Sequence, residues 1–578
     1  MKANVLVIGK GGRENAMVFS LAKSDKVEKI FIITGNGGTE GILGKSFNVS
    51  HINENEHQKI LEFINQNNIS LTVVGPEGPL SEGIVDFLQE NKKPVFGPEK
   101  AAAKLESSKI FMKDVLVKAG VPTAKYKAFK FNEKEEAFSF LETFKGSSIV
   151  IKADGLAAGK GVVICQNIEE AKKEVSEFLE GKFGDSSKQI VIEEFLDGFE
   201  ASLFGVTDGT EVLAFGSACD HKRIFDNDLG GNTGGMGTFS PSFLTPIQEK
   251  KLTETLIKPV VLELAKRGIK YKGVLFAGLM VCDEEVKVLE FNARFGDPET
   301  QSILSRFEGD FYELCFRTAN ETLKGFEAKF RKLNAVSVVL ASKGYPETSS
   351  KGDAISLPAV SENTFIFHAG TLLKDNILQT DGGRVLAVTS LAKSKKEARE
   401  KAYKAISGIS FEGMQFRKDI GEELVSFQML FNEMKWKEVG IGFYDFFSRL
   451  LKITLKTHFS YINDSSKLNK IYEFSILLTN DAEMQELNKQ HRGKDKPTNV
   501  LSFPLGEEYE KGKVIMGDIV IALETMQKEA LEQEKTFKEH LAHLFVHSVL
   551  HLFEYDHEIP SEMEEMEELE DKILNQVF

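Results

Sequence analysis

The sequence predicts a multidomain protein, α/β in its N-terminal part and α+β in its C-terminal part. Its 578 residues are too many for one core, since domains usually hold roughly 100 to 200 residues. Near the start, short apolar segments alternate with helical patterns, which is typical of open parallel sheets. Near residue 422, composition and charge change together, which indicates a second, separate domain.

Residues 1–101 carry the alternation most clearly. The segments NVLVIG, KIFIIT, LTVVGP and PVFGP are short and apolar and end at Gly or Pro, which predicts buried parallel strands. Segments between them, such as ENAMVFSLAKS, have helical periodicity. We therefore expect an open parallel α/β sheet over this range.

The rest of the chain divides into three further predicted domains. Residues 102–330 mix helices with strands such as SIVIKA, QIVIEEFL, VLAFGSA and VKVLEFNARF. Residues 331–421 are β-rich, with AVSVVLAS, TFIFHAGT and GGRVLAVTS before a helix at KEAREKAYKAISGI. The next boundary is expected near residues 422–428, and a small α+β domain over 425–578 follows.

Composition and charge limit the classes of partner. A hydrophobic content of 42% and a charged content of 28% are typical of globular proteins, and no apolar run is long enough to cross a bilayer. The four cysteines have no metal-type spacing and the start has no signal-peptide pattern, so we expect reduced thiols in a cytoplasmic protein without membrane contact.

The net charge of −15 is concentrated at the C-terminal end. From Glu422 onward there are 30 acidic and 17 basic residues, a net of −13, whereas the first 421 residues carry only −2. Because an acidic surface repels phosphate backbones, any RNA contact in the C-terminal part is expected to be confined to a local basic patch.

The first candidate site is a glycine loop between a strand and a helix. Gly9, Gly11 and Gly12 lie where backbone N–H groups can approach a phosphate at a helix N-terminus. The spacing is not G-x-G-x-x-G and the second strand, KIFIITGNGG, has no terminal acid, so a dinucleotide fold is not indicated. A tight turn without a ligand is the alternative.

Lysines form the second candidate site. In IVIKADGLAAGKGVV, Lys152 ends a strand before a glycine-rich loop, but the loop is one residue short of a P-loop and Gly161 replaces its Ser or Thr. Lys109, in ESSKIFMKD, is a second phosphate-binding candidate, although lone lysines are usually solvated. A nucleoside-triphosphate site other than a P-loop is therefore expected.

The segment VKVLEFNARFGDPETQ gives a stronger signal. Alternate side chains of a strand share a face, so Glu290, Asn292 and Arg294 are expected to point the same way. Glu and Asn oxygens suit Mg²⁺, and the arginine suits a carboxylate or phosphate. The alternative is a polar strand face exposed to water. A separate glycine-rich loop, GGNTGGMG, follows DHKR and is expected to contact a substrate.

Residues 1–421 resemble the phosphoribosylamine–glycine ligase (glycinamide ribonucleotide synthetase) family of ATP-grasp enzymes. The resemblance follows the chain in order: GKGGREN, GNGGT, VVGPEGPL, FGPEKAAAKLESSKIFMK, IKADGLAAGKGV, VIEEFLDGFEAS, DHKR, NTGGMG, LEFNARFGDPETQ, SKGYPE, FHAGT, GGRVLAV and RKDIG. It implies an ATP-grasp fold. It also implies that ATP, with Mg²⁺ or Mn²⁺, activates glycine as glycyl phosphate, which the amine of 5-phosphoribosylamine attacks.

The resemblance also implies residue roles. Lys109 and Lys152 would hold ATP phosphates, and Glu290 and Asn292 would bind Mg²⁺. The adenosine contacts would be Glu193, Phe195, Leu196 and Glu200, the glycine and acyl-phosphate contacts Asp220 and Arg294, and the phosphoribosyl contacts Gly11, Gly12, Asn232, Thr233 and Gly234. Two departures occur: Asn15 replaces the family's usual His, and Gly231 its usual Pro.

Three histidines close to the C-terminus predict a metal site. In HSVLHLFEYDH, His547 and His551 are i, i+4 within a helical pattern and so share a face, and His557 follows after a turn expected at 554–556. Three nitrogens leave the fourth zinc position for water, as in catalytic sites. His540 and His543 lie outside this pattern and are expected to be surface or packing residues.

Ser548 excludes the zinc-protease pattern H-E-x-x-H, because the general base would stand at its position. Upstream, LNKQHRGKDKPTNVLSFP is expected to be a basic loop containing Arg492, followed by a strand, and MGDIVIALETMQKEA a strand followed by a helix. With these segments, residues 425–578 resemble the YbeY-type endoribonucleases of ribosomal RNA maturation. The resemblance implies Zn²⁺ on the three histidines, Arg492 as the RNA-phosphate or transition-state contact, and single-stranded rRNA or the small ribosomal subunit as partner. Ser548 and Glu554 replace the family's usual glycines, so Glu554 is expected to need a positive φ.

Alternatives remain for both parts. The C-terminal domain could be a hydrolase with another substrate, or a ribosome-binding module that keeps a metal for folding. The N-terminal part could be a related ATP-grasp ligase with a different acid or amine.

Overall fold

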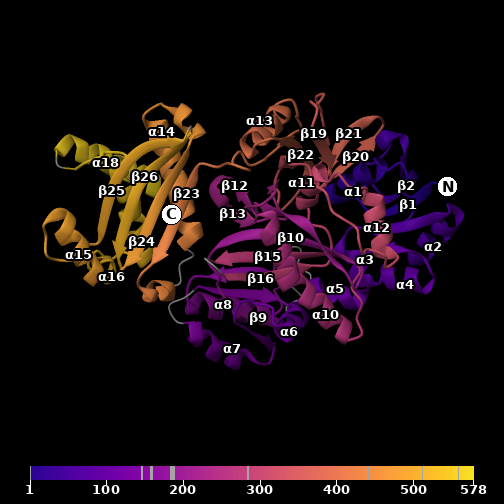
Figure 1. Cartoon of the computed structure of the whole chain (residues 1–578), viewed down its shortest axis with the longest axis horizontal. Coiled ribbons are helices and arrows are strands. Elements are labelled where there is room, and N and C mark those ends of the chain that lie inside the picture. The colour runs from indigo at the N-terminus through magenta and orange to yellow at the C-terminus, as the bar shows by residue number, and fades with distance from the viewer. Residues whose placement is uncertain are drawn as a thin grey trace. The chain divides into compact units, whose positions relative to one another are not determined.

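The computed structural model describes residues 2–144, 148–155, 161–182, 189–282, 285–439, 443–510, 512–557 and 559–577. By its internal contacts the chain divides into one unit over residues 1–143 and 149–421 and a second unit over residues 144–148 and 422–578. The two units have separate sheets (Figure 1). Each also has its own buried apolar core.

The N-terminal sheet of the first unit is parallel, with the strand order β3-β2-β1-β4-β5. The strands are β1 (Ala3–Gly9), β2 (Val27–Thr34), β3 (Ser46–Val49), β4 (Ile69–Val74) and β5 (Val95–Phe96). The helices that follow them are α1 (Gly12–Ala22), α2 (His57–Gln66), α3 (Glu77–Glu82) and α4 (Ile84–Glu90). The predicted open parallel sheet is confirmed, and the four strands expected from apolar segments are β1, β2, β4 and β5.

A smaller antiparallel sheet follows, in the order β6-β9-β7-β8. It consists of β6 (Tyr126–Lys130), β7 (Ile149–Ala153), β8 (Val162–Cys165) and β9 (Gln189–Glu194), and α7 (Lys134–Leu141) and α8 (Ile168–Leu179) pack with it. The preceding helices are α5 (Lys100–Ser107) and α6 (Lys109–Ala119).

The largest sheet spans two of the predicted domains, in the order β16-β15-β10-β11-β14-β17-β22-β19. Its strands are β10 (Phe199–Thr207), β11 (Val212–Asp220), β14 (Gly237–Ser240), β15 (Gly273–Cys282), β16 (Glu285–Asn292), β17 (Asn334–Ala341), β19 (Thr364–His368) and β22 (Arg384–Ala392). Pairing of β14 with β17 makes the sheet continuous across residue 330. Residues 102–330 and 331–421 therefore share one sheet.

Shorter elements complete the first unit. They are the β12 (Arg223–Phe225) and β13 (Leu229–Asn232) pair, the sheet of β18 (Lys351–Ala354), β20 (Thr371–Lys374) and β21 (Ile377–Asp381), and the helices α9 (Pro246–Leu252), α10 (Lys258–Lys266), α11 (Glu299–Arg306), α12 (Phe311–Ala319) and α13 (Lys395–Ile406).

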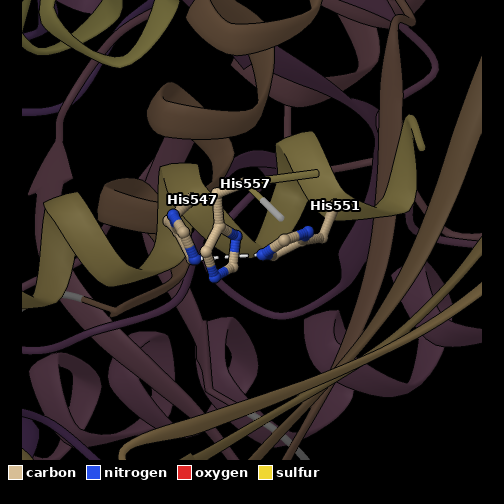
Figure 2. A group of neighbouring side chains, drawn as sticks. All are labelled: His547, His551 and His557. Carbon is tan, nitrogen blue, oxygen red and sulfur yellow. Dashed lines mark hydrogen bonds between the residues drawn. The ribbon is translucent and has the colours of Figure 1, made fainter. Parts of the chain in front are cut away.

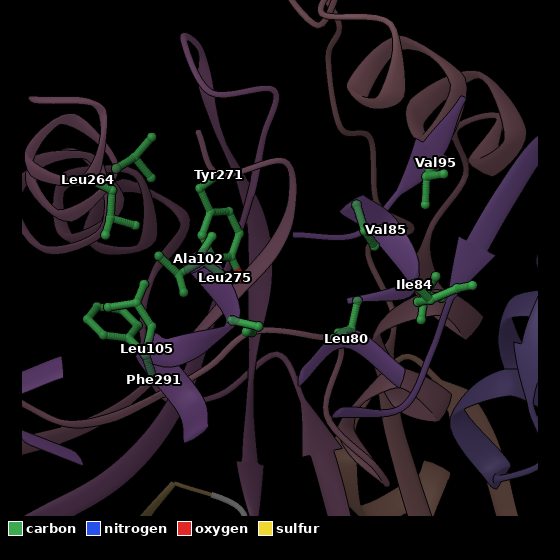
Figure 3. Close-up of a cluster of buried hydrophobic side chains, with 14 of the residues drawn as sticks. Leu80, Ile84, Val85, Val95, Ala102, Leu105, Leu264, Tyr271, Leu275 and Phe291 are labelled. Atoms are coloured by element: carbon green, nitrogen blue, oxygen red, sulfur yellow. The ribbon is translucent and has the colours of Figure 1, made fainter. Parts of the chain in front are cut away.

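A buried apolar cluster holds the strand that carries the predicted magnesium ligands. Phe291 of β16 is 1% exposed and belongs to a cluster with Leu105, Leu264, Tyr271 and Leu275 (Figure 3). Burying a side chain of this size contributes roughly 1.5 to 3 kcal/mol. Because neighbouring side chains of a strand point to opposite faces, this burial directs the residues on either side of Phe291 away from the core.

The second unit contains one mixed sheet in the order β23-β24-β26-β25, in which only the β25–β26 pair is antiparallel. The strands are β23 (Val425–Phe431), β24 (Ile471–Thr479), β25 (Val500–Glu510) and β26 (Lys513–Ala522). The helices are α14 (Phe443–Tyr461), α15 (Asp481–Arg492), α16 (Leu523–Glu532), α17 (Phe537–Leu552) and α18 (Pro560–Leu574). Helix α17 packs on α14, α16, α18 and the sheet.

Trp436, the single tryptophan of the chain, is fully buried in the second unit. Its indole Nε1 donates to the carbonyl oxygen of Thr479 at 2.8 Å. Its fluorescence therefore reports on the folding of this unit alone.

Three other expectations have an outcome. Cys165, Cys219 and Cys315 are free and buried as expected, and the Cys282 side chain lies outside the described residues. None of the described helices combines the length and apolar content that a membrane crossing requires. Arg492 was expected in a loop, but it is the last residue of α15, because the helix continues until Gly493 adopts a φ of +69°.

Candidate functional site

Glu290 and Asn292 lie on the same face of β16. Their partners on β15 are Gly278 and Phe276, and the pairing shifts by one residue beside Leu289, which forms a bulge. Beyond the bulge the alternation is regular, so Phe291 enters the core and the two oxygen-bearing side chains turn away from it. The structure thus brings together the two residues predicted to hold Mg²⁺.

Positive charge surrounds the Glu290 carboxylate. Burial alone would raise its pKa, but the ammonium groups of Lys109, Lys222 and Lys152 lower the pKa to about 2. Both lysines predicted to hold phosphates therefore lie near the predicted magnesium ligand. An ionised carboxylate among ammonium groups is the environment that a metal-bound polyphosphate requires.

Glu193 links two buried lysines. Its Oε2 is 3.1 Å from Lys152 Nζ and 3.0 Å from Lys113 Nζ, and Lys113 is fully buried. Lys113 also donates to Thr123 Oγ1 at 2.7 Å, and burial lowers its pKa to about 8. Glu193 Oε1 is buried and has no hydrogen-bond partner among the described residues, so it can accept a hydrogen bond from a ligand.

Leu196, three residues after Glu193 in the chain, belongs to a small apolar cluster. Ala124, Leu196 and Met280 are buried together, and Leu289 packs against them. Such a cluster and a free carboxylate oxygen suit a flat heteroaromatic ring with an amino group. Phe195 is half-buried. The remaining predicted adenosine contact, Glu200, is exposed, and its carboxylate forms an ion pair with Lys222.

Asp154 holds the start of helix α6, where Lys109 is the first residue. Its Oδ1 accepts hydrogen bonds from Ile110 N at 3.0 Å and Ser108 Oγ at 3.1 Å. Lys152 and Lys109, which are far apart in sequence, are thereby tied to the same turn. Residues 156–160 of the predicted glycine-rich loop lie outside the described residues.

Asp220, at the end of β11, has an electrostatic environment opposite to that of Glu290, because its pKa is raised and not lowered. Burial and the nearby Glu299 carboxylate raise the pKa of Asp220 to about 8. Its Oδ1 has no hydrogen-bond partner within the part of the chain that the structure describes. A Cβ at Gly235 would lie 2.8 Å from this oxygen, so a glycine is needed there.

Replacing Asp220 with Asn should stabilise the ligand-free protein. The pKa of Asp220 is higher in the folded protein than in the unfolded chain, where it is near 3.8. Its contribution to the free energy of unfolding is therefore fully present below pH 3.8 and is lost as pH rises through about 8. D220N removes that loss, so its melting temperature should exceed that of the wild type by at least about 2 °C at pH 8. The difference should shrink towards pH 4, which melting curves across pH would measure.

The control for this prediction is Asp25→Asn, which removes an exposed carboxylate. It should leave the melting temperature unchanged at every pH. A D220N protein that melts below the wild type at pH 8 would contradict the assignment.

The two predicted substrate loops meet at the segment around Asp297. Arg13 N, in the first loop, donates to Asp297 Oδ2 at 3.1 Å, and a Cβ on Gly12 would lie 2.5 Å from Gln301 Nε2. The second loop is held by Arg384, whose guanidinium donates to the carbonyl oxygen of Asp297 at 2.6 Å and also to that of Gly234.

Within the second loop, Asn232 ends β13 and Thr233 Oγ1 donates to the carbonyl oxygen of Lys222 at 2.8 Å. Gly234 N donates to Tyr345 Oη at 3.0 Å. Gly231, which departs from the family pattern, is exposed, and a Cβ there would meet nothing within 4 Å. Gly11 N donates to Glu14 Oε2 at 2.6 Å in the first loop.

Arg294 is held by two protein carboxylates. Its guanidinium lies 2.9 Å from Glu77 and 2.9 Å from Glu106. Burial opposes its charge, but Glu106 and Glu77 raise its pKa further. The arginine therefore stays charged and fixed, and its field also acts on Glu290.

Asn15, which departs from the family pattern, uses both atoms of its neutral amide to hydrogen-bond to the backbone. Its Nδ2 donates to the carbonyl oxygen of Gly38 at 2.9 Å, and its Oδ1 accepts from His368 N at 3.0 Å. The amide thus joins segments from the first and last parts of the unit.

In the second unit the three histidines converge (Figure 2). One ring nitrogen each of His547, His551 and His557 lies within 4.8 Å of the others, and the Nε2 atoms of His547 and His551 are 3.0 Å apart. Burial and the neighbouring His547 lower the pKa of His551, which favours the neutral, metal-binding form. The residues present therefore fit a three-nitrogen metal site.

The two departures near this site are accommodated. Ser548 is buried and its Oγ donates to the carbonyl oxygen of Leu544 at 2.8 Å within the helix. Glu554 has a φ of +66°, as expected for a position usually occupied by glycine. Arg492, Lys494 and Lys496 are exposed.

Comparisons with known proteins match family models to both units of the chain. The family models for phosphoribosylglycinamide synthetase match over residues 3–106 (N domain), 107–300 (ATP-grasp domain) and 335–423 (C domain), and the model for endoribonuclease YbeY matches residues 446–578.

Relatives named phosphoribosylamine–glycine ligase are similar over most of their length. The one from Ralstonia nicotianae is 44% identical over 425 residues, which are 73% of this chain and 99% of the relative. The one from Caldanaerobacter subterraneus subsp. tengcongensis is 47% identical over 422 residues, 72% of this chain and 99% of the relative.

Two solved structures bear on the fold. The phosphoribosylamine–glycine ligase of Thermotoga maritima superposes with a TM-score of 0.64 at 35% identity, over 72% of this chain and all of that one. A biotin carboxylase–ATP analogue complex from Campylobacter jejuni has a TM-score of 0.56 at 16% identity, over 73% and 94% of the two chains, and shows the shared ATP-grasp fold alone. This chain belongs to the phosphoribosylamine–glycine ligase family and carries a YbeY-type domain at its C-terminal end.

Proposed function

We propose that the first unit joins glycine to 5-phosphoribosylamine at the expense of ATP. The γ-phosphoryl group passes to the glycine carboxylate, giving glycyl phosphate and ADP. The amine then attacks the acyl carbon and releases phosphate, leaving glycinamide ribonucleotide. The convergence of Lys109, Lys152 and Glu290 supports this proposal, because phosphoryl transfer depends on alignment and charge neutralisation.

Other predicted residues bind the metal ion and the adenosine in this proposal. Glu290 and Asn292 hold Mg²⁺ or Mn²⁺, which when bound neutralises phosphate charge. Glu193 accepts from the adenine amino group, Leu196 lines the ring, and Glu200 takes the ribose hydroxyls.

Asp220 lies where the glycine ammonium group would bind, because a cation there would relieve its repulsion with Glu299. Arg294 faces the acyl phosphate. The two glycine loops around Asp297 hold the phosphoribosyl group.

ADP release measured with each substrate omitted in turn tests the reaction. Formation of ADP should require glycine and 5-phosphoribosylamine together. The rival, an ATP-grasp ligase with another acid or amine, predicts that ADP release stays at the background rate with this pair.

For the second unit we propose a zinc-dependent endoribonuclease that cleaves single-stranded RNA during rRNA maturation. The observation that carries the proposal is the convergence of His547, His551 and His557. The three imidazoles would hold Zn²⁺, which when bound would supply a water that ionises near neutral pH. The chain's own contribution is to direct one nitrogen from each of three imidazoles to one point and to offer basic side chains to RNA phosphates.

Arg492→Ala should weaken RNA binding without changing the metal site. Losing one phosphate contact should lower affinity by roughly tenfold and reduce the slope of log K against log salt by about 1. Lys528→Ala, an exposed charge on α16, is the control and should change neither quantity. Binding of single-stranded RNA across a salt series gives both values, and identical slopes for wild type and R492A would refute the assignment.

Two alternatives predict different results for the intact chain. A ribosome-binding module would associate with small subunits and cleave no RNA with zinc present. A hydrolase with another substrate would bind zinc but neither cleave nor bind single-stranded RNA.

A further inference from the structure

Glu570 of helix α18 contacts His547 of the proposed metal site through the ring nitrogen Nδ1. Its Oε1 is 2.7 Å from His547 Nδ1, on the side of the ring opposite the nitrogen that faces His551. His551 has an equivalent contact, since its Nδ1 is 2.8 Å from the carbonyl oxygen of Tyr555. In both rings Nδ1 points to an oxygen that can only accept, so Nδ1 carries the proton and Nε2 the lone pair.

We propose that Glu570 is the positioning residue of the metal site, which fixes the tautomer and orientation of His547. This inference rests on the proposed metal site of the second unit. A ligating histidine generally gives its second ring nitrogen to a carboxylate or a carbonyl, which orients the ring and raises its basicity. Glu570 supplies the carboxylate here, and Tyr555 supplies the carbonyl to the neighbouring ligand.

The surroundings of Glu570 are rigid enough for this role. The residue is 6% exposed, and its neighbour Leu569 is fully buried in the core of the unit. Its second oxygen, Oε2, is 3.1 Å from Nε2 of His543, one turn before His547 on α17. Because both oxygens are engaged, the carboxylate cannot rotate away from His547.

Glu570 is distinct within a strongly acidic helix. The other glutamates of α18, at 562, 564, 565, 567 and 568, are exposed. The buried one lies beside Leu569 on the face that packs against α17. The strongly acidic helix α18, whose charge repels RNA phosphates, therefore contributes a side chain that contacts the proposed metal site.

Cobalt binding to the full chain separates positioning from simple packing. Glu570→Gln keeps the shape and an acceptor oxygen but removes the charge. It should weaken Co²⁺ binding about 10- to 100-fold and alter the visible absorption of the bound ion. Glu570→Leu, which keeps neither, should weaken binding further.

A matched control is Glu529 of α16, which also contacts a histidine of α17. Glu529 contacts His540 of α17 at 3.2 Å, and His540 is outside the histidine trio. Glu529→Gln should leave the affinity and spectrum of Co²⁺ unchanged. Trp436 fluorescence verifies that the second unit is folded in every variant.

The outcomes are distinguishable. Wild-type affinity and spectrum in E570Q, with Trp436 fluorescence unchanged, would overturn the positioning role and leave the metal site intact. Absence of Co²⁺ binding by the wild type would overturn the metal site and the positioning role together. If E570L is unfolded, the isosteric E570Q variant decides.

Discussion

Glu290→Gln is expected to lower the rate of ADP formation about 100- to 1000-fold, the effect of losing several kcal/mol of transition-state charge stabilisation. The amide keeps the size of the side chain but removes a negative charge that faces three lysines. It also exchanges a charged metal ligand for a weaker one. The measurement is steady-state ADP release at saturating ATP, glycine and 5-phosphoribosylamine over a Mg²⁺ titration.

Glu285→Gln is the matched control for this variant. Glu285 begins the same strand, and its side chain is 62% exposed, with Lys287 at 3.6 Å. E285Q should change the rate by less than twofold. An E290Q rate within threefold of the wild type would remove Glu290 from the proposed magnesium site.

Glu290 and Asp220 have opposite effects on the stability of the ligand-free protein. The pKa of Glu290 is lowered to about 2, so its charge stabilises the fold above the unfolded value near 4.5 and this gain is lost as pH falls towards 2. The pKa of Asp220 is raised to about 8, so the fold loses stability as pH rises from the unfolded value near 3.8 through about 8. Both carboxylates belong to one proposed site, and the difference arises from their neighbours: lysines for one and Glu299 for the other.

The strands of the N-terminal sheet could be predicted because each is a continuous apolar segment. The strand β3 (Ser46–Val49) could not, since it is short and not continuously apolar. Nor could the continuity of the large sheet across residue 330, because it depends on pairing between residues 237–240 and 335–338, almost 100 residues apart. Such pairing leaves no local pattern.

The proposed metal ligands could be predicted where the spacing of residues in the sequence places their side chains on one face of a helix or strand. His547 and His551 share a helical face, and Glu290 and Asn292 share a strand face. Lys113 was missed, although it follows Lys109 by four residues on α6 and the same helical rule would have indicated it.

Glu570 was missed for a different physical reason. Six glutamates lie between residues 562 and 570, and the sequence alone does not distinguish them. Only the packing of α18 on α17 selects one of them for burial against His547. Contacts of this kind depend on how two helices pack, and a single sequence does not specify that packing.

The two units allow each proposed activity to serve as a control for the other. The predicted magnesium ligands and the histidine trio lie in different units with separate cores. Loss of one activity in a point variant should therefore leave the other unchanged. Coupled loss would indicate that the units depend on each other for folding.

His551→Ala is expected to abolish RNA cleavage and to weaken zinc binding at least about 100-fold. The variant removes one of three converging nitrogens and leaves the Nε2 of His547 without its neighbour at 3.0 Å. An outer partner of a ligand typically accounts for about 10- to 100-fold in affinity, so a ligand itself should account for more. Zinc affinity is measured by chelator competition, and cleavage on unstructured RNA of defined length.

The H551A result is decisive only if the second unit remains folded. Since Trp436 lies in the core of that unit and is the single tryptophan, an unchanged emission spectrum and an unchanged ADP-forming rate would establish that both units are intact. His491→Ala, an exposed histidine at the end of α15, is the control for zinc affinity and should bind zinc like the wild type. If H551A bound zinc as tightly as the wild type, the histidine trio could not be the metal site. If the wild-type protein bound zinc but cleaved no RNA, the non-catalytic ribosome-binding alternative would be favoured.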